Sequence, residues 1–438
     1  MDENWKADLE GWLAPFLDAL RHKVRARMCP AYVAGLIGAG DRKSVQPMAA
    51  RDGGVGYDQL HHFIASAAWD AAPLEKVLLI EADRMVGGAD AWLIVDDTAL
   101  PKKGDRSVGV APQYASSLGK NANCQTLVSL TLAGGEVPVM VGLRLFLPES
   151  WTSDPERLSR AAVPEDHSGY LTKPEIALTE IDRVCAAGLR FGCVLADAGY
   201  GLSASFRQGL SERGLVWAVG IPFKQKVYSV DVAMVFPVAG RGRPRKRHIP
   251  DVASISAQAM LEEAPWRMLS WRRGTKGRLQ ARFAAKRVRI ADGPPQRIGS
   301  MGAQHLPGEE VWLIGEHRSN GERKYYLSNL PADTSLTRLA GAIKARWICE
   351  QAHQQLKEEL GLDHFEGRSW TGLHRHALMA MIAYAFLQSR RLKQAKREKK
   401  TPRPAAAAYP SSNPRGHHRH LRPTTTNPMP ALPPIARS

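Results

Sequence analysis

Cysteine is scarce in this chain, and its spacing matches neither a disulfide framework nor a zinc site. The 438 residues include five cysteines, and no two of them form a Cys-x-x-Cys pair. Small secreted domains depend on dense cysteine pairing, and structural zinc sites depend on closely spaced ligands. The sequence therefore favours a reducing compartment, and its length supports roughly two or three domains with hydrophobic cores of their own.

A long hydrophobic run is also missing. The most apolar stretch, residues 377–387, covers eleven residues, whereas a membrane-spanning helix needs about 20. The chain begins with acidic residues where a secretory signal has a basic start followed by an apolar run. We therefore expect a cytoplasmic protein that does not enter a membrane, and a buried core helix over residues 377–387.

Acidic residues are outnumbered, with 43 Asp and Glu against 60 Lys and Arg, which gives a formal net charge of +17. Such an excess makes a polyanion the expected partner, with nucleic acid ahead of an anionic membrane surface. The excess is uneven. Residues 390–438 hold twelve basic residues and one acidic residue, and residues 240–248 hold five basic residues and no acidic one. The rest of the chain is therefore nearly neutral.

Hydrophobic periodicity divides the chain into segments. Residues 1–88 have the spacing of amphipathic helices, and from residue 91 the pattern becomes that of β-strands. A tight turn at Gly134-Gly135 predicts a hairpin. The expected strands are 91–97, 124–135, 136–148, 191–201 and 215–221, and the expected helices between them are 173–188 and 203–213.

The second half of the chain begins with an irregular strand-like segment, residues 222–330, which we interpret as an inserted β-rich module. A strong helix is expected from residue 335 to 361 and another over about 372–392. Residues 393–438 form a basic tail, in which nine prolines after residue 400 and the string HHRH at 417–420 predict disorder.

Three acidic positions occur where an α/β fold gathers functional groups. Asp96 and Asp97 end the first expected strand, Asp197 ends the fourth, and Glu350 lies within the helix from residue 335. Carboxylates at strand ends and on a covering helix can meet at one edge of a sheet. Hard oxygen ligands of this kind hold pairs of Mg²⁺ for phosphoryl transfer. Each acid taken alone is better explained as a surface carboxylate or a helix N-cap, and it is the order and context of the three together that favour a metal site.

The helix from residue 335 changes character along one face. Positions 336, 339 and 343 are apolar, whereas 346, 350, 354 and 357 on the same stripe are polar or charged. This change indicates a helix that leaves the core and enters a cleft, where Glu350 binds metal and Arg346 and Lys357 contact phosphate. The alternative is an exposed Arg346–Glu350 ion pair on a solvated surface.

These residues resemble a known family. The segment RWICEQAHQQLK (346–357) is similar to the R-(3)-E-(6)-K part of the Y-(2)-R-(3)-E-(6)-K signature of DDE transposases from bacterial insertion sequences. Residues 94–125, 194–201 and 361–388 also resemble one branch of that group, the DDE superfamily endonucleases. The resemblance covers roughly residues 60–390. Ile343 stands where the signature has tyrosine, so the contact of that phenol with phosphate is absent or supplied elsewhere.

The resemblance implies an α/β fold of the RNase H-like type, a mixed sheet with flanking helices that a β-rich insertion interrupts. Its core would comprise residues 89–221 and 331–392, with the insertion at 222–330 and an N-terminal helical, DNA-end-binding domain at 1–88. Asp96, Asp197 and Glu350 would be the catalytic, metal-binding acids. Arg346 and Lys357 would accompany them at the catalytic centre. Two Mg²⁺ ions, for which Mn²⁺ substitutes, would be the cofactors.

The choice between Asp96 and Asp97 needs a separate argument. Adjacent side chains of a strand point to opposite faces of the sheet, so only one of the two can face the metal ions. The place of Asp96 in the motif IVDD favours Asp96 as the first acid.

Several basic residues are candidate DNA contacts. Residues 241–248 read RGRPRKRH, similar to short hooks that insert arginine into narrow A·T-rich minor grooves. The alternative is a solvated linker that touches phosphates without base preference. The residues expected to contact DNA are Lys102, Lys103, Lys120, Arg241, Arg243, Arg245, Lys246 and Arg247.

We therefore expect a DNA transposase that cuts at the ends of an insertion sequence and joins the freed 3′-hydroxyl to target DNA. Its partners would be double-stranded DNA, as terminal inverted repeats and target, and further copies of the chain on paired DNA ends. The resemblance places it in a bacterial cytoplasm at the nucleoid. Two alternatives stay open: an RNase H-like nuclease or resolvase that cuts without joining, and a catalytically inactive DNA-binding descendant.

Overall fold

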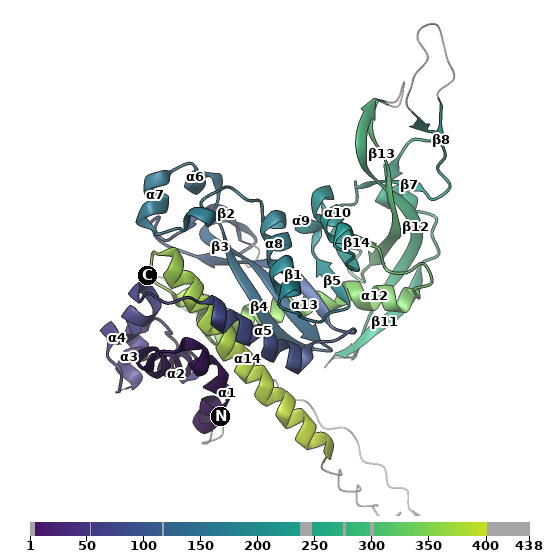
Figure 1. Cartoon of the computed structure of the whole chain (residues 1–438). Helices are drawn as coiled ribbons and strands as arrows, with labels where there is room; N and C mark the ends of the chain where they lie inside the picture. Colours follow the sequence, from purple (N-terminus) through teal and green to yellow (C-terminus); the bar gives the residue numbers. More distant parts are fainter. Residues whose placement is uncertain are drawn as a thin grey trace, which may run out of the picture. The chain divides into compact units, whose positions relative to one another are not determined.

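The computed structural model describes residues 5–52, 54–115, 118–236, 248–274, 277–297 and 302–400. Residues 1–393 form one compact unit, so the last described residues, 394–400, lie beyond it. Figure 1 shows the helices and strands of the chain. The division of residues 1–392 into an N-terminal domain, a catalytic core and an insertion remains a prediction. Among the described residues, no helix is both long enough and apolar enough to cross a membrane.

The N-terminal region is helical. Its elements are α1 (Trp5–Leu20), α2 (Lys23–Ile37), α3 (Val45–Asp52), α4 (Tyr57–His61), the π-helical turn η1 (His62–Ser66) and α5 (Ala72–Val86). Helix α1 buries Leu9, Leu13 and Phe16 at helical spacing. Helix α5 packs against strands β3 (Lys120–Gly134) and β4 (Val137–Phe146) of the sheet. The helical region thus continues into the layer that covers the sheet.

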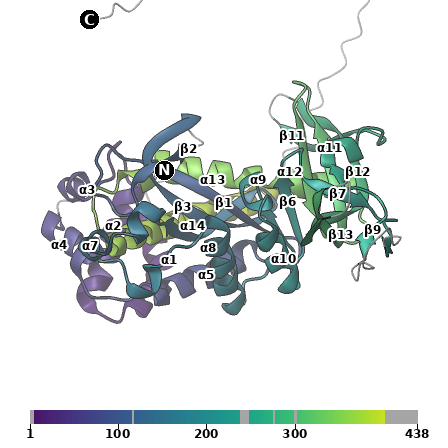
Figure 2. The ribbon, with the colours of Figure 1, turned by 90° about the horizontal axis from the view of Figure 1, so that it is seen from above.

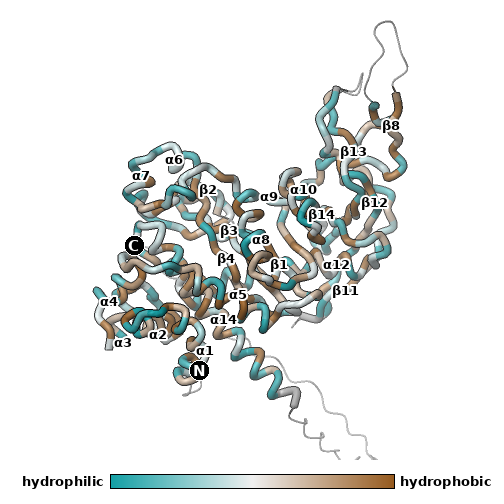
Figure 3. Tube along the Cα trace, viewed as in Figure 1, coloured by the Kyte–Doolittle hydropathy of each residue, from teal (hydrophilic) through white to brown (hydrophobic). Residues whose placement is uncertain are grey.

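A large mixed sheet forms the centre of the unit. β3 pairs with β4 and with β1 (Trp92–Pro101), both antiparallel, and its first residues pair with β2 (Ala111–Ala115). On its other side β1 runs parallel to β5 (Cys193–Ala196), which runs parallel to β6 (Trp217–Ile221). The β3–β4 hairpin expected from the sequence is present, and Gly135 in its turn has φ of +59°. Figure 3 shows hydrophobic segments along these central strands.

Two sets of helices cover opposite faces of this sheet. Helix α8 (Lys173–Ala186) contacts β3 and β4 on the same side as α5, whereas α13 (Trp347–Glu358) contacts β1, β3 and β4 on the other side. In Figure 2, α13 lies on one side of β1 and β3, and α8 and α5 lie on the other. Between β5 and β6 the chain forms α9 (Ala198–Gly201) and α10 (Ala204–Glu212).

The segment expected to be β-rich extends the same sheet. Strand β14 (Arg323–Ser328) pairs with β6, and β13 (Ala303–His317) lies between β14 and β12 (Gly277–Arg297). Shorter strands in this segment are β7 (Lys226–Ser229), β8 (Met234–Val235), β9 (Ile249–Pro250), β10 (Ile255–Ser256) and β11 (Arg267–Gly274), with helix α11 at Ala257–Met260. The β12–β13 register shifts between Ala291 and Pro295, where glycine and prolines interrupt regular pairing.

Two expectations about the C-terminal helices need correction. The helix predicted from 335 to 361 is divided at Arg346 into α12 (Leu336–Ala345) and α13. At the break, the carbonyl oxygen of Arg346 accepts a hydrogen bond from the backbone N–H of Cys349 at 3.2 Å, three residues later. Helix α14 (Trp370–Lys400) continues past the expected end at residue 392. The tail residues 401–438 lie outside the described residues.

Candidate active site

Asp96 and Asp197 lie at the point where β1 and β5 separate. The parallel pairing of these strands ends at Val95 and Ala196, and the two aspartates are the next residues in each chain segment. The prediction that Asp97 ends the first strand was wrong, because β1 continues to Pro101 through its pairing with β3. Beyond Val95, β1 is therefore paired on one side only, with β3. The opening on its other side is the edge at which open α/β sheets place their sites.

Asp197 is held by the helix that follows it. Its side chain caps α9, with Oδ1 accepting hydrogen bonds from the backbone N–H groups of Gly199 at 2.9 Å and Tyr200 at 3.3 Å. Gly201 lets this short helix approach β6, because a Cβ there would lie 1.9 Å from the carbonyl oxygen of Gly220. The Tyr200 hydroxyl then donates to the backbone oxygen of Asp96 at 3.3 Å.

Arg346 links two of the three candidate acids. One guanidinium nitrogen lies 2.6 Å from Oδ2 of Asp96, and the other lies 2.6 Å from Oε1 of Glu350. The side chain of Asp96 is only 13% exposed, whereas that of Glu350 is 61% exposed. The predicted Arg346–Glu350 ion pair therefore exists, but it reaches inward to Asp96 and is not confined to the surface.

Burial and mutual repulsion make this a site that favours a cation. Burial raises the pKa of Asp96, although the charge of Arg346 and hydrogen bonds from Cys349 and Asp97 partly oppose the change. Burial also raises the pKa of Asp197, and the negative charge of Asp96 adds to the effect. Two carboxylates whose charges are disfavoured in this way gain stability from a bound positive charge.

Asp97 faces the opposite side of the sheet. Its carboxylate forms an ion pair with Lys173 at the start of α8, whereas Asp96 faces Arg346 and Cys349 from α12 and α13. The alternation of side chains along β1 separates the two aspartates. The geometry therefore favours Asp96 over Asp97 as the first acid, in agreement with the motif.

Two further residues near Asp96 were not identified from the sequence. The thiol of Cys349 lies 3.1 Å from Oδ2 of Asp96, and His353 follows one turn later on α13. The Nε2 atom of His353 lies 2.8 Å from the hydroxyl of Ser129 on β3, and burial lowers the pKa of this histidine to about 4. The i, i+4 spacing of Cys349 and His353 was visible, but nothing in the sequence shows that their face meets Asp96.

A cleft of about 550 Å³ opens from the acids toward the β-rich segment. It is bordered by Asp197, Arg346 and Glu350 on one side, and by aromatic and basic side chains on the other. The basic residues are Arg318, Arg323, Lys324 and Lys344. Trp347 also borders it, and its ring faces the guanidinium of Arg272 at 4.7 Å. Positive charge thus surrounds the carboxylates, which suits a phosphate backbone as occupant.

The remaining residues proposed from the sequence have weaker links to the three candidate acids. Burial lowers the pKa of Lys357, with Asp363 acting in the opposite direction, and no ion pair among the described residues joins Lys357 to Asp96, Asp197 or Glu350. Lys103 and Lys120 are exposed, as a DNA contact requires. Arg241, Arg243, Arg245, Lys246 and Arg247 lie outside the described residues.

Lys102, which was predicted to contact DNA, forms hydrogen bonds within the protein. Its ammonium group donates hydrogen bonds to the backbone oxygens of Asp363 at 3.0 Å and Phe365 at 2.8 Å. Burial lowers its pKa, which is consistent with a group removed from solvent. Lys102 therefore connects the end of β1 to the segment between α13 and α14.

This connection predicts different results for two neighbouring lysines. Lys102→Ala should lower the free energy of unfolding by about 1–3 kcal/mol, because it leaves two partly buried carbonyl oxygens without their charged donor. Lys103→Ala should change it by less than about 0.5 kcal/mol and should weaken DNA binding. Urea unfolding and salt-dependent DNA binding measure both effects. Full stability of Lys102→Ala with weakened DNA binding would support the predicted DNA contact of Lys102 and contradict its structural role.

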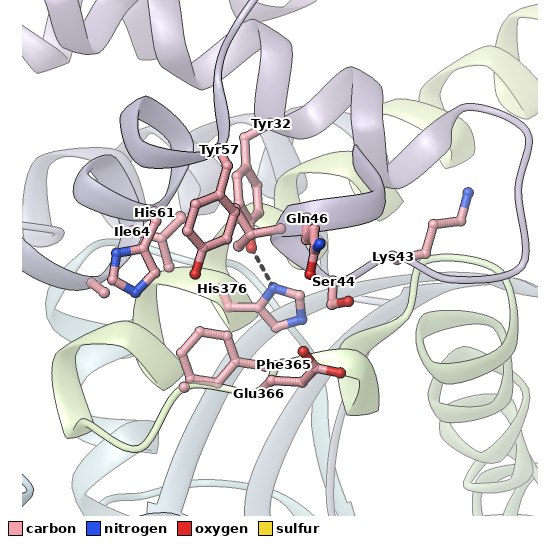
Figure 4. Close-up of a pocket in the computed structure, with 13 residues that line it drawn as sticks. Tyr32, Lys43, Ser44, Gln46, Tyr57, His61, Ile64, Phe365, Glu366 and His376 are labelled. Atoms are coloured by element: carbon pink, nitrogen blue, oxygen red, sulfur yellow. Dashed lines mark hydrogen bonds between the residues drawn. The ribbon is translucent and has the colours of Figure 1, made fainter. Parts of the chain in front are cut away.

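A separate small pocket of about 140 Å³ lies between the N-terminal helices and the segment after α13. Figure 4 shows the Tyr32 hydroxyl pointing toward His376, and the two are joined by a 2.8 Å hydrogen bond. The ring of Phe365 stacks on His376 at 5.3 Å. None of the three candidate acids borders this pocket. The Tyr32–His376 hydrogen bond at its wall connects α2 to α14.

The sequence of the chain matches those of known proteins. The family model for the DDE superfamily endonuclease matches residues 15–278, and that for the transposase DDE domain matches residues 171–386. The first match includes Asp96 and Asp197, and the second includes Asp197 and Glu350. The probable transposase for insertion sequence element IS701 of Microchaete diplosiphon is 33% identical over 181 residues, which are 41% of this chain and 44% of that protein. The chain thus spans less than half of the length of that relative.

Two solved structures show weak likeness. A piggyBac transposase synaptic complex with hairpin DNA is 10% identical, with 90% of this chain and 74% of that chain covered and a TM-score of 0.40. The NurA nuclease from Sulfolobus solfataricus is 10% identical, with 75% and 91% covered and a TM-score of 0.22. TM-scores this low carry no information about a shared fold or function. The match to the endonuclease model, in contrast, covers more than half of the chain, and the protein therefore belongs to the DDE superfamily endonuclease family.

Proposed function

We propose that the protein is a DNA transposase that cuts at the ends of an insertion sequence and joins them to target DNA. One observation carries this proposal. Asp96 and Asp197 occupy adjacent positions where β1 and β5 separate, and Arg346 ties Asp96 to Glu350 beside a cleft with basic walls. Two acids that border a cleft with basic walls, with Asp96 beside them, suit in-line phosphoryl transfer.

The strand order supports an RNase H-like core for this site. An antiparallel meander of β1, β3 and β4 is followed by β5 and β6, which run parallel to β1. Strands β7 to β14 then separate β6 from the helix that carries Glu350. We propose that this segment is an insertion in the catalytic fold, and that the N-terminal helices recognise the ends of the element.

The donor set of the site fits a pair of Mg²⁺ ions, with Mn²⁺ as a substitute. Asp96, Asp197 and Glu350 offer only carboxylate oxygens, which these hard ions prefer. The raised pKa values of both aspartates and the guanidinium between Asp96 and Glu350 indicate a place that requires positive charge. When bound, such ions activate the attacking oxygen and stabilise the leaving oxygen of the displacement.

The protein's own groups have distinct tasks in this proposal. Arg346 keeps the carboxylates of Asp96 and Glu350 oriented, and with cations held by those carboxylates its guanidinium would be available to a phosphate oxygen. Asp97, paired with Lys173, takes no part in the reaction. The basic side chains of the cleft, including Arg318 and Arg323, hold the DNA backbone. Paired DNA ends require more than one copy of the chain.

A strand-transfer assay tests the proposal. The full chain, Mg²⁺ and a duplex that ends in the element's terminal inverted repeat should give cleaved ends and, with target DNA added, joined products. Cleavage without joining would indicate a nuclease or resolvase. DNA binding without cleavage would indicate an inactive descendant. A duplex with a scrambled repeat is the control, and equal cleavage of both duplexes would contradict recognition of an element end.

A further inference from the structure

A second set of potential metal ligands includes Asp96. Ligand atoms of Asp96, Cys349 and His353 all lie within 4.8 Å of one another. The two residues from α13 are separated by four positions and so lie on one face of the helix. Asp96 approaches that face from β1, with its Oδ2 atom 3.1 Å from the sulfur of Cys349. The three donors come from a strand and a helix that pack against each other.

The chemistry of this set differs from that of the three acids. A thiolate, an imidazole and one carboxylate form a soft and mixed ligand set, which Zn²⁺ and Co²⁺ favour and Mg²⁺ does not. Zinc sites with three protein ligands also occur, with water or another ligand in the fourth position. The set is therefore unsuited to the catalytic ions and suited to a thiophilic one.

The surroundings of the ligands support ion binding. Cys349 is fully buried and His353 is 6% exposed, so neither side chain is free to turn away into solvent. The Ser129 hydroxyl lies 2.8 Å from Nε2 of His353 and 3.1 Å from the backbone oxygen of Asp96. A hydroxyl in this place orients the imidazole, as the outer partners of metal-binding histidines do.

We propose that Asp96, Cys349 and His353 bind a single Zn²⁺ ion, and that this ion inhibits the protein by withdrawing Asp96 from the catalytic ions. On binding, the S–H bond of Cys349 breaks, its proton passes to solvent, and the sulfur forms a bond to zinc. No oxidant or reductant is needed. Arg346 loses its contact with Asp96 and keeps its contact with Glu350.

Co²⁺ binding to the full chain tests the site directly. A cobalt–thiolate bond gives a charge-transfer absorption in the near ultraviolet, which the histidines at 417–420 of the tail cannot produce. The wild-type protein should show this absorption at one equivalent of Co²⁺, and added Zn²⁺ should abolish it. Cys349→Ser should lack it, because serine keeps a hydrogen-bond donor beside Asp96 and offers no thiolate.

Cys185→Ser is the matched control, because Cys185 is exposed on α8 and lies outside the cluster. It should bind Co²⁺ as the wild type does, and Cys349→Ser should bind Zn²⁺ at least about tenfold more weakly than either. Cys349→Ala repeats the measurement if the serine variant folds poorly. Retention of the absorption in both Cys349 variants, its absence from the wild type, or its loss in Cys185→Ser would overturn the proposal.

Binding of the ion does not depend on the proposed transposition, whereas inhibition does. Micromolar Zn²⁺ should reduce Mg²⁺-dependent cleavage by the wild type, and Cys349→Ser should need at least about tenfold more Zn²⁺ for the same reduction. A protein that shows the charge-transfer absorption and never cuts DNA would contradict the proposed function alone. Cleavage that is equally sensitive to Zn²⁺ in wild type and Cys349→Ser would overturn the inhibitory role.

Discussion

Asp197→Asn is expected to lower the rate of DNA-end cleavage by about 10³-fold or more. The substitution removes one carboxylate charge from the position where β1 and β5 separate. Metal ions at such a site contribute several kcal/mol to transition-state stabilisation, and each 1.4 kcal/mol corresponds to about tenfold in rate. Single-turnover cleavage of a terminal-repeat duplex at saturating Mg²⁺ measures the loss.

The same substitution should leave the ion-free protein as stable as the wild type or more stable. Asparagine keeps a side-chain oxygen that can cap α9 in the place of Oδ1 of Asp197. The folded-state pKa of Asp197 is raised by burial and by Asp96, so the folded protein binds protons more readily than the unfolded chain does. At neutral pH the ionised carboxyl therefore destabilises the fold, and this effect disappears as the pH falls through the raised pKa.

Three further measurements distinguish a loss of catalysis from a loss of folded protein. Asp197→Ala should lose the same activity and, in addition, about 1 kcal/mol of stability through the missing cap. Asp182→Asn, on α8, breaks only an exposed ion pair with Arg213 and should retain cleavage. Mg²⁺ should raise the melting temperature of the wild type and not that of Asp197→Asn. Near-normal cleavage by Asp197→Asn would exclude this carboxylate from the reaction.

The sequence predicts where the strands of the site occur because each strand has a local signal. The strand expected over 191–201 is shorter, however, because β5 ends at Ala196 and residues 198–201 form α9. A Gly-Gly turn between two strand-like segments identifies β3 and β4, and apolar runs identify β1, β5 and β6. The end of β1 was placed too early. Asp96 and Asp97 interrupt the apolar pattern, but pairing with β3 carries the strand to Pro101. Backbone pairing to a neighbour distant in sequence has no signature in the strand itself.

The arrangement of side chains around Asp96 required the structure. Cys349 and His353 have helical spacing, but buried helix faces commonly contain such residues, and only the packing of α13 on β1 and β3 gives them a carboxylate partner. Lys102 follows the first acid closely in sequence and was predicted to contact DNA, but its hydrogen-bond acceptors are backbone oxygens more than 250 residues away. Such contacts depend on tertiary structure and not on local pattern.

Glu316→Gln is expected to lower the free energy of unfolding by about 3–5 kcal/mol, the range for breaking a buried ion pair. The side chain of Glu316 is fully buried on β13. Its carboxylate accepts hydrogen bonds from Lys344 at 2.7 Å, Arg318 at 3.0 Å and Tyr326 at 2.9 Å. Glutamine has one acceptor oxygen and turns an N–H₂ group toward these donors, so at least one buried donor loses its partner.

The acid sensitivity of the fold should change with this residue. Burial alone would raise the pKa of Glu316, but the hydrogen bonds and charge of Lys344, together with Arg318 and Tyr326, lower it overall. A lowered pKa stabilises the fold at neutral pH, and that stabilisation is lost as the pH falls through the folded-state value. Urea unfolding should therefore show a smaller loss of stability on acidification for Glu316→Gln than for the wild type.

The matched control lies on the same strand. Glu310 pairs with Arg287 at 3.0 Å, but its side chain is 51% exposed, and exposed pairs contribute at most about 1 kcal/mol. Glu310→Gln should therefore unfold close to the wild type. Because Arg318, Tyr326 and Lys344 also border the cleft beside Glu350, Glu316→Gln should weaken DNA binding as well. Equal stability of the two variants would mean that the buried network does not hold β13, β14 and α12 together.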